Sequence, residues 1–126
     1  MKANSNFELH IHKDSSISSI QSDFNFVYPF LKITFLQNDK KVNANYSTEK
    51  LASKIFYPKR SNSKINIDKK TTVAELIKNL GLIFKIPILI FRKSGNVWVE
   101  TSLTEDWTLE EQNKEGEQIS LLLSLK

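Results

Sequence analysis

The stretch that decides the fold spans residues 65–84 and reads INIDKKTTVAELIKNLGLIF. Ile65 and Ile67 alternate with polar residues, which is the period of a half-buried strand. Thr72 and Glu75 have the spacing of a capping box, in which each side chain binds a free backbone amide at the start of a helix. The apolar residues that follow have helical spacing: Val73, Leu76, Ile77, Leu80, Ile83 and Phe84. The sequence therefore predicts a strand followed by an amphipathic helix.

A similar pattern starts 56 positions earlier, at Leu9 instead of Ile65. Leu9 and Ile11 alternate with polar residues, and Ser15 or Ser16 can cap the helix that follows. The apolar stripe of this helix is Ile17, Ile20, Phe24, Val27 and Tyr28, and Pro29 marks its end. The gap-free match continues into the next strand, where it aligns Ile33 with Leu89 and Phe35 with Phe91. We expect a strand–helix–strand unit used twice, through duplication or because any such unit needs this pattern.

The rest of the chain gives shorter signals. Residues 31–35 alternate as a strand, and a Ser94–Gly95 turn leads into a return strand at residues 97–99. Thr108 and Glu111 form a second capping box, which predicts a short helical turn. The last strand is predicted from alternating apolar residues, namely Ile119, Leu121, Leu123 and Leu125.

The order of elements from residue 63 onward resembles the ubiquitin-like β-grasp. The resemblance is carried by residues 65–80, 88–91 and 108–125 and covers about half of the chain. It implies an α+β fold with a mixed sheet. The length of 126 residues predicts a single domain, residues 1–126. Within that domain, residues 31–37 and 63–126 form the core, residues 1–30 add a strand and a helix, and residues 38–62 are inserted in the first hairpin. Inside the insertion, residues 48–56 are expected to form a short helix.

Residues 91–98 and 106–109 also look like a family of small bacterial proteins without assigned function, which implies no chemistry. Conjugated ubiquitin-like proteins end in Gly-Gly, whereas this sequence ends Leu-Ser-Leu-Lys. A covalent modifier is therefore not expected.

The β-grasp resemblance implies binding through an exposed sheet face, and the family's apolar patch maps to Ile90, Ser120 and Leu122. The alternation agrees: if Leu89 and Phe91 face the core, Ile90 faces away from it. The alternative is that residues 1–30 or the insertion cover this face. The sequence predicts a non-catalytic protein–protein interaction module or an adaptor subunit of a bacterial assembly, whose protein partner it does not identify.

Composition excludes several classes of function. The 126 residues contain no cysteine, so disulfides, thiolate metal sites and cysteine nucleophiles are absent. With only 3 glycines there is no glycine-rich phosphate loop, and no cofactor is expected. The polar start and an apolar stretch limited to residues 80–91 predict neither a signal peptide nor a membrane span. We expect a cytoplasmic protein.

Catalytic and metal-binding patterns are weak. His10 and His12 point to one side of a strand, but a metal site needs a third ligand and none is close in sequence. Glu105, Asp106 and Glu110 suit a solvated turn, with Glu111 as the cap partner. No enzyme activity is predicted.

Nucleic-acid binding is the alternative function. Residues 1–93 carry 16 basic and 7 acidic side chains, and residues 94–126 carry 2 and 7. This asymmetry can steer a partner or another copy of the chain. Within residues 50–70, Phe56 and Tyr57 can stack on bases, and cations can bind phosphates. The basic residues of this candidate site are Lys54, Lys59, Arg60, Lys64, Lys69 and Lys70.

Overall fold

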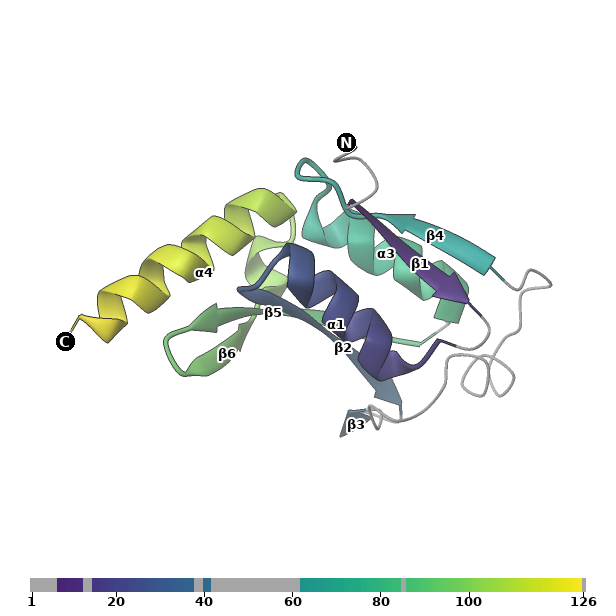
Figure 1. Cartoon of the computed structure of the whole chain (residues 1–126), viewed down its shortest axis with the longest axis horizontal. Coiled ribbons are helices and arrows are strands. Elements are labelled where there is room, and N and C mark those ends of the chain that lie inside the picture. Colours follow the sequence, from purple (N-terminus) through teal and green to yellow (C-terminus); the bar gives the residue numbers. More distant parts are fainter. Residues whose placement is uncertain (1–6, 13–14, 38–39, 42–61, 85, 126) are drawn as a thin grey trace.

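A computed structural model describes residues 7–12, 15–37, 40–41, 62–84 and 86–125 (Figure 1). It confirms the α+β class. The elements are, in chain order, β1 (Glu8–His12), α1 (Ile17–Val27), β2 (Leu31–Gln37), β3 (Lys40–Lys41), β4 (Asn62–Asn66), α3 (Val73–Phe84), β5 (Ile88–Ser94), β6 (Val97–Glu100), the 3-10 turn η2 (Ser102–Thr104) and α4 (Leu109–Ser124). The helix expected at residues 48–56 lies outside the described residues.

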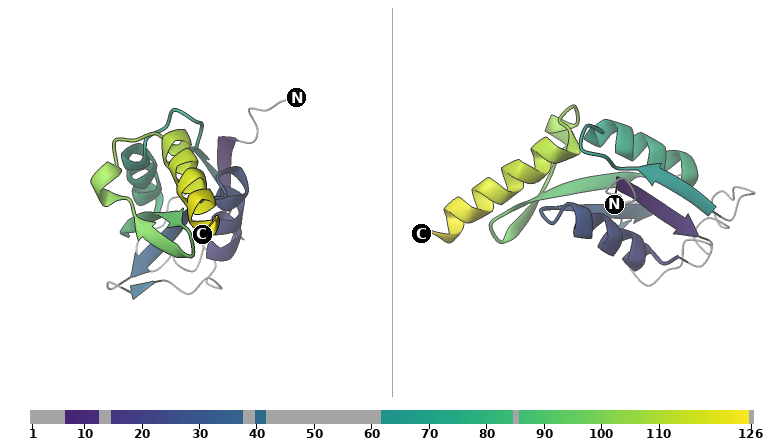
Figure 2. Two further views of the ribbon diagram at one scale, coloured as in Figure 1. Left: turned by 90° about the vertical axis from the view of Figure 1, so that its left-hand side faces the viewer. Right: turned by 45° about the horizontal axis from the view of Figure 1, so that its top comes forward.

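Two antiparallel sheets enclose the hydrophobic core. β1 pairs with β4, and the larger sheet has the order β3-β2-β5-β6. Helix α1 packs on β1 and β2, and α3 packs on β4 and β5. The two helices therefore flank the core between the sheets (Figure 2). Inside it, the rings of Phe35 and Phe84 meet edge to face with centroids 5.2 Å apart, a favourable aromatic geometry.

The predicted strand–helix–strand repeat is confirmed, since β1-α1-β2 is followed by β4-α3-β5. The two units are cross-paired: strands of one unit pair with strands of the other. Leu9 lies opposite Ile65 in the small sheet, and Ile33 lies opposite Ile90 in the large one. All four side chains are buried. The halves are thus related by an approximate twofold axis through these two pairs, and neither half completes a sheet alone.

The match between the halves shifts by one residue after the second helix. α1 and α3 start 56 positions apart, at Ile17 and Val73, but α3 has 12 residues where α1 has 11. As a result β2 and β5 start 57 positions apart, at Leu31 and Ile88.

This shift reverses the predicted faces of β5. Ile88 and Ile90 are buried in the core, whereas Leu89 and Phe91 are partly exposed. The prediction that Leu89 and Phe91 face the core is therefore wrong. A gap-free alignment cannot detect one added helical residue, and one residue is enough to turn every side chain of a strand to the other face.

The predicted last strand is also wrong, because residues 109–124 form the continuous helix α4. Leucine, glutamate, glutamine and lysine are good helix formers, and Ile119 is the only β-branched residue in the segment. All strand pairings among the described residues are antiparallel. The β-grasp arrangement, which needs the last strand in a mixed sheet, is therefore not confirmed.

Candidate functional site

The start of α4 is fixed to the start of α3. The backbone N–H groups of Val73 and Ala74 donate to the carbonyls of Trp107 and Glu105, and those of Leu109 and Glu110 donate to Thr71 and Lys69. These bonds satisfy amides that have no partner within their own helix. Each helix start thus completes the other.

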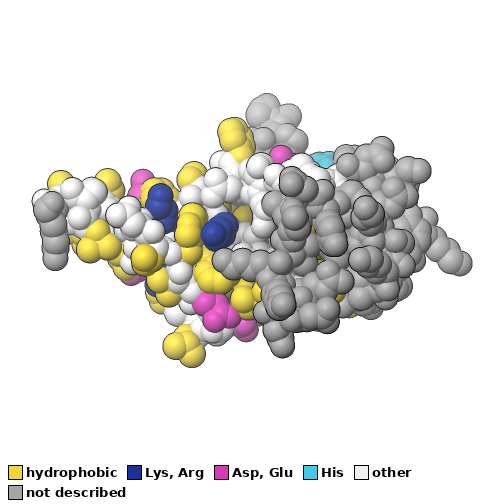
Figure 3. Space-filling model, turned by 90° about the horizontal axis from the view of Figure 1, so that it is seen from below, with side chains coloured by type: hydrophobic (Ala, Val, Ile, Leu, Met, Phe, Trp, Pro, Cys, Tyr) yellow, Lys and Arg dark blue, Asp and Glu magenta, His cyan; other side chains and the backbone are white. Residues whose placement is uncertain are grey.

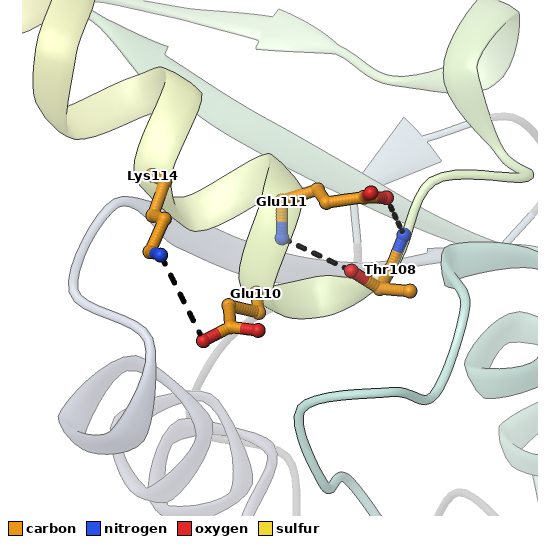
Figure 4. A network of polar contacts seen from close by, with 4 residues as sticks. All are labelled: Thr108, Glu110, Glu111 and Lys114. Carbon is orange, nitrogen blue, oxygen red and sulfur yellow. Dashed lines mark hydrogen bonds and ion pairs between the residues drawn. The ribbon is translucent and has the colours of Figure 1, made fainter.

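Both predicted capping boxes are present. At α4 the Thr108 hydroxyl accepts a hydrogen bond from the Glu111 N–H at 3.1 Å, and the Glu111 carboxylate accepts one from the Thr108 N–H at 2.9 Å (Figure 4). Thr72 and Glu75 make the same pair of bonds at α3. Acidic residues in the first turn also offset the positive end of each helix dipole.

A buried polar network joins α4 to β5. The guanidinium of Arg92 donates to the Gln112 side-chain oxygen at 2.8 Å and lies over the ring of Trp107. The fully buried Gln112 amide donates in turn to the carbonyl and the hydroxyl of Thr104. The Nε of Arg92 has no hydrogen-bond partner within the described part of the chain. Nothing in the sequence pattern indicated this network, because its members lie far apart along the chain.

The middle of α4 approaches the sheet closely. The side-chain oxygen of Asn113 accepts a hydrogen bond from the Phe30 N–H at 2.9 Å. At Gly116 an added Cβ would come within 2.9 Å of Phe30 and 3.1 Å of the Lys93 carbonyl oxygen. Helix and sheet touch here because residue 116 has no side chain.

The end of α4 projects from the body (Figures 1 and 2). Its last contacts are with the β5–β6 turn, where the Gly95 N–H donates to the Ser120 hydroxyl and Leu123 packs on Gly95. Four leucines in this segment are exposed: Leu121 by 58%, Leu122 by 63%, Leu123 by 45% and Leu125 by 81%. Apolar side chains are visible around this projecting end in Figure 3. We call Leu121–Leu123 with Leu125 the leucine end of α4.

A groove of about 380 Å³ lies beside the first half of α4. Its apolar lining comes from Phe7 and from the end of α1, where Phe26 is 81% exposed. The charged and polar lining consists of Lys69, Glu110, Asn113, Lys114 and Glu117. We call this hollow the α1–α4 groove.

Tyr28 also lines this groove, with its ring buried at the core side. Its hydroxyl donates to the Ile67 carbonyl at 2.6 Å. Burial, with the nearby carboxylates of Asp68 and Glu110, raises the pKa of the Tyr28 phenol above its ordinary value. Tyr28 is therefore a neutral structural donor at neutral pH.

The predicted apolar patch is not formed. Ile90 is only 1% exposed and belongs to the core. Ser120 lies on α4 and holds the Gly95 amide, while Leu122 is exposed in the leucine end. Because residues 119–124 are helical, Leu122 does not lie on a sheet beside Ile90.

The basic candidate site is placed only in part. Lys54, Lys59 and Arg60 lie outside the described residues. Lys64 is exposed on β4, and Lys69 and Lys70 are exposed in the turn before α3.

The structure also places most of the weaker catalytic and metal-binding candidates. No group of three or more His, Asp or Glu side chains among the described residues lies close enough to hold a metal ion. His10 lies on β1 with its Nε2 3.7 Å from a carboxylate oxygen of Glu8, and the side chain of His12 lies outside the described part. Glu105 and Asp106 lie in the turn that leads to α4, with Glu110 and Glu111 in its first turn.

Comparison with protein-family models, with curated proteins and with solved structures finds no match. Among the residues that the structure places, no helix combines the length and the apolar character that crossing a membrane requires.

Proposed function

We propose that this chain is a non-catalytic, cytoplasmic protein-binding module, such as an adaptor subunit of a bacterial assembly, and that it binds through the leucine end of α4. One observation carries this proposal: the last contacts of α4 with the body are those of Ser120 and Leu123 with Gly95, and the leucines in this last part of the helix are exposed together. Single exposed apolar residues are common, but a cluster of them marks an interaction site. Covering it is favourable by roughly 25 cal/mol per Å² of apolar surface. The proposal rests on α4 and does not require a ubiquitin-like sheet face.

The test is capture of a protein from a lysate of the source cells, with the full chain as bait. The Leu122→Glu, Leu125→Glu double variant changes the leucine end without touching the contacts that hold α4. Leu103→Glu is the matched control, since Leu103 is 97% exposed and lies in η2. We expect wild type and the control to retain the same protein, which can be an untagged native copy of this chain. The double variant should lose that protein. Equal capture by all three baits contradicts the proposal.

The nucleic-acid alternative is tested with the same bait. Phosphate contacts by Lys64, Lys69 and Lys70 predict binding that falls steeply with salt and is removed by nuclease. Binding through leucines predicts weak salt dependence and no effect of nuclease. Recovery of salt-sensitive nucleic acid without a protein would favour the alternative.

A further inference from the structure

We propose that the leucine end binds a second copy of this chain, with the two α4 helices antiparallel and Leu121 and Leu125 of each copy seated in the α1–α4 groove of the other. This inference rests on the proposed function, because it names the partner of the same leucines.

The groove and the exposed leucines lie on one face of α4. Glu110, Lys114 and Glu117 line the groove. In a helix, positions three or four apart follow one another along one face. Continuing this row past Glu117 reaches Leu121 and then Leu125. The face therefore has a groove beside its first half and exposed leucines on its second half.

A face with a groove at one end and leucines at the other is complementary to a second copy of itself. A twofold contact presents the same surface from both copies. When the two helices run antiparallel, the second half of each α4 lies against the first half of the other. Both sets of leucines then meet a groove at once. A parallel pair would place leucine on leucine and leave both grooves open.

The apolar side chains of the groove match the exposed leucines. The groove offers Phe26, which is 81% exposed on the last turn of α1, together with Phe7 and Val27. An aromatic ring in a hollow is a common anchor of protein interfaces. Leucines of a second copy would cover this ring while leaving water themselves, so the same contact buries both exposed apolar groups.

The charged side chains of this face also fit a contact between two copies. A surface that meets its own copy cannot carry one sign, because like charges would face each other. The groove carries Lys69 and Lys114 against Glu110 and Glu117, and Lys114 lies 4.0 Å from the Glu110 carboxylate. The further acids Glu111 and Glu115 fall on another side of α4 by helical spacing. The face is therefore balanced, which fits a second copy better than a strongly basic partner.

The molecular mass of the chain in solution tests whether two copies pair. Analytical ultracentrifugation of the full chain, from about 1 μM to about 1 mM, covers weak and moderate affinities. We expect a doubled mass for wild type and a single-chain mass for two variants on different elements, Leu121→Glu with Leu125→Glu on α4 and Phe26→Glu on α1. Leu122→Glu, on another side of α4, and Leu103→Glu should keep the doubled mass. Circular dichroism establishes that each variant is folded. A dimer that survives Phe26→Glu overturns the proposed docking.

Helix direction is tested separately, because the chain has no cysteine of its own. Chains carrying Phe26→Cys and chains carrying Leu121→Cys are oxidised alone and mixed. Antiparallel docking predicts a disulfide dimer mainly in the mixture. Dimers from Leu121→Cys chains alone would indicate leucine against leucine and contradict the arrangement.

The outcomes also separate the two proposals. A wild-type chain with a single-chain mass at every concentration overturns pairing with a second copy. If wild type captures another protein from the lysate and the Leu122→Glu, Leu125→Glu bait does not, the proposed function stands without pairing of two copies. If substituting the leucines changes neither the captured protein nor the mass in solution, both proposals are rejected.

Discussion

Gly116 and Gly81 both lie inside helices but have opposite surroundings. A Cβ at Gly116 would press on Phe30 and on the Lys93 backbone, whereas a Cβ at Gly81 meets nothing within 4 Å. Gly116→Ala should therefore lower the free energy of unfolding by about 1–3 kcal/mol through overpacking. Gly81→Ala should raise it by about 0.5–1 kcal/mol, because alanine costs less conformational entropy in a helix. Urea unfolding measures both, and two changes of the same sign would contradict the close approach of α4.

Asp68 gives a prediction for acid pH. Burial raises the pKa of its carboxyl, but hydrogen bonds from Asn66, from Thr71 and from the backbone N–H of Lys70 outweigh burial and lower the pKa below its ordinary 3.8. A carboxylate with a lowered folded-state pKa stabilises the fold above its ordinary pKa, and this contribution is lost as the pH falls through the folded-state value.

The Asp68→Asn variant tests this contribution. Its melting temperature should lie below that of wild type at neutral pH, and the two curves should converge as the pH falls through the lowered pKa of the Asp68 carboxyl. Thermal unfolding followed between about pH 2 and pH 6 measures this difference. Parallel curves over the whole range would show that the Asp68 charge is not coupled to folding.

Ile90 shows how far single residues can be predicted. The sequence correctly predicts a strand here, but residues 88–91 are all apolar, so alternation fits either face. The added residue of α3 decides which face turns inward. A pattern of period two carries no information on this point when both faces are apolar.

At the scale of elements, the start of α4 was predicted correctly, but its second half was wrongly predicted to be a strand. The capping box at Thr108 and Glu111 was recognisable, and it did begin a helix. The alternating leucines near the end suggested a strand, although leucine favours helices and β-branched residues were nearly absent. The opposite charges of Glu110 and Lys114, four positions apart, were a signal that could have favoured a helix. The attachment of α4 through Arg92 and Gln112 had no local signal.

The Gln112 amide provides a test of that attachment. Gln112→Leu keeps the size of the side chain but leaves the Arg92 guanidinium without its acceptor. The Thr104 carbonyl loses one of its two donors and keeps the Trp107 N–H. A buried polar group left unpaired costs about 1–3 kcal/mol, so the free energy of unfolding should fall by about that much. Gln118→Leu, at an exposed position of the same helix, should change it by less than about 0.5 kcal/mol. Urea unfolding that gives equal values for both variants would contradict a structural role for the network.

At the scale of the whole molecule, the cross-paired halves make one cooperative unit. β1 needs β4 and β2 needs β5, and one hydrophobic cluster contains side chains from both halves. The repeat of pattern could be read from the sequence. The cross-pairing could not be predicted, because a strand–helix–strand pattern does not specify which other strands its own strands pair with.

Cooperativity between the halves predicts that damage to the first half is felt in the second. Ile20 is buried on α1, and Ile20→Val should cost about 1 kcal/mol, which lowers the melting temperature by roughly 4 °C. Both tryptophans, Trp98 and Trp107, lie in the second half, so their fluorescence reports unfolding there. Because both sheets contain strands from both halves, the fluorescence midpoint should fall together with the midpoint from far-ultraviolet circular dichroism. Leu103→Val, at an exposed position, should move neither. A fluorescence midpoint that stays at the wild-type value in Ile20→Val would mean that the second half unfolds independently of the first. The cross-pairing would then not couple the stabilities of the two halves.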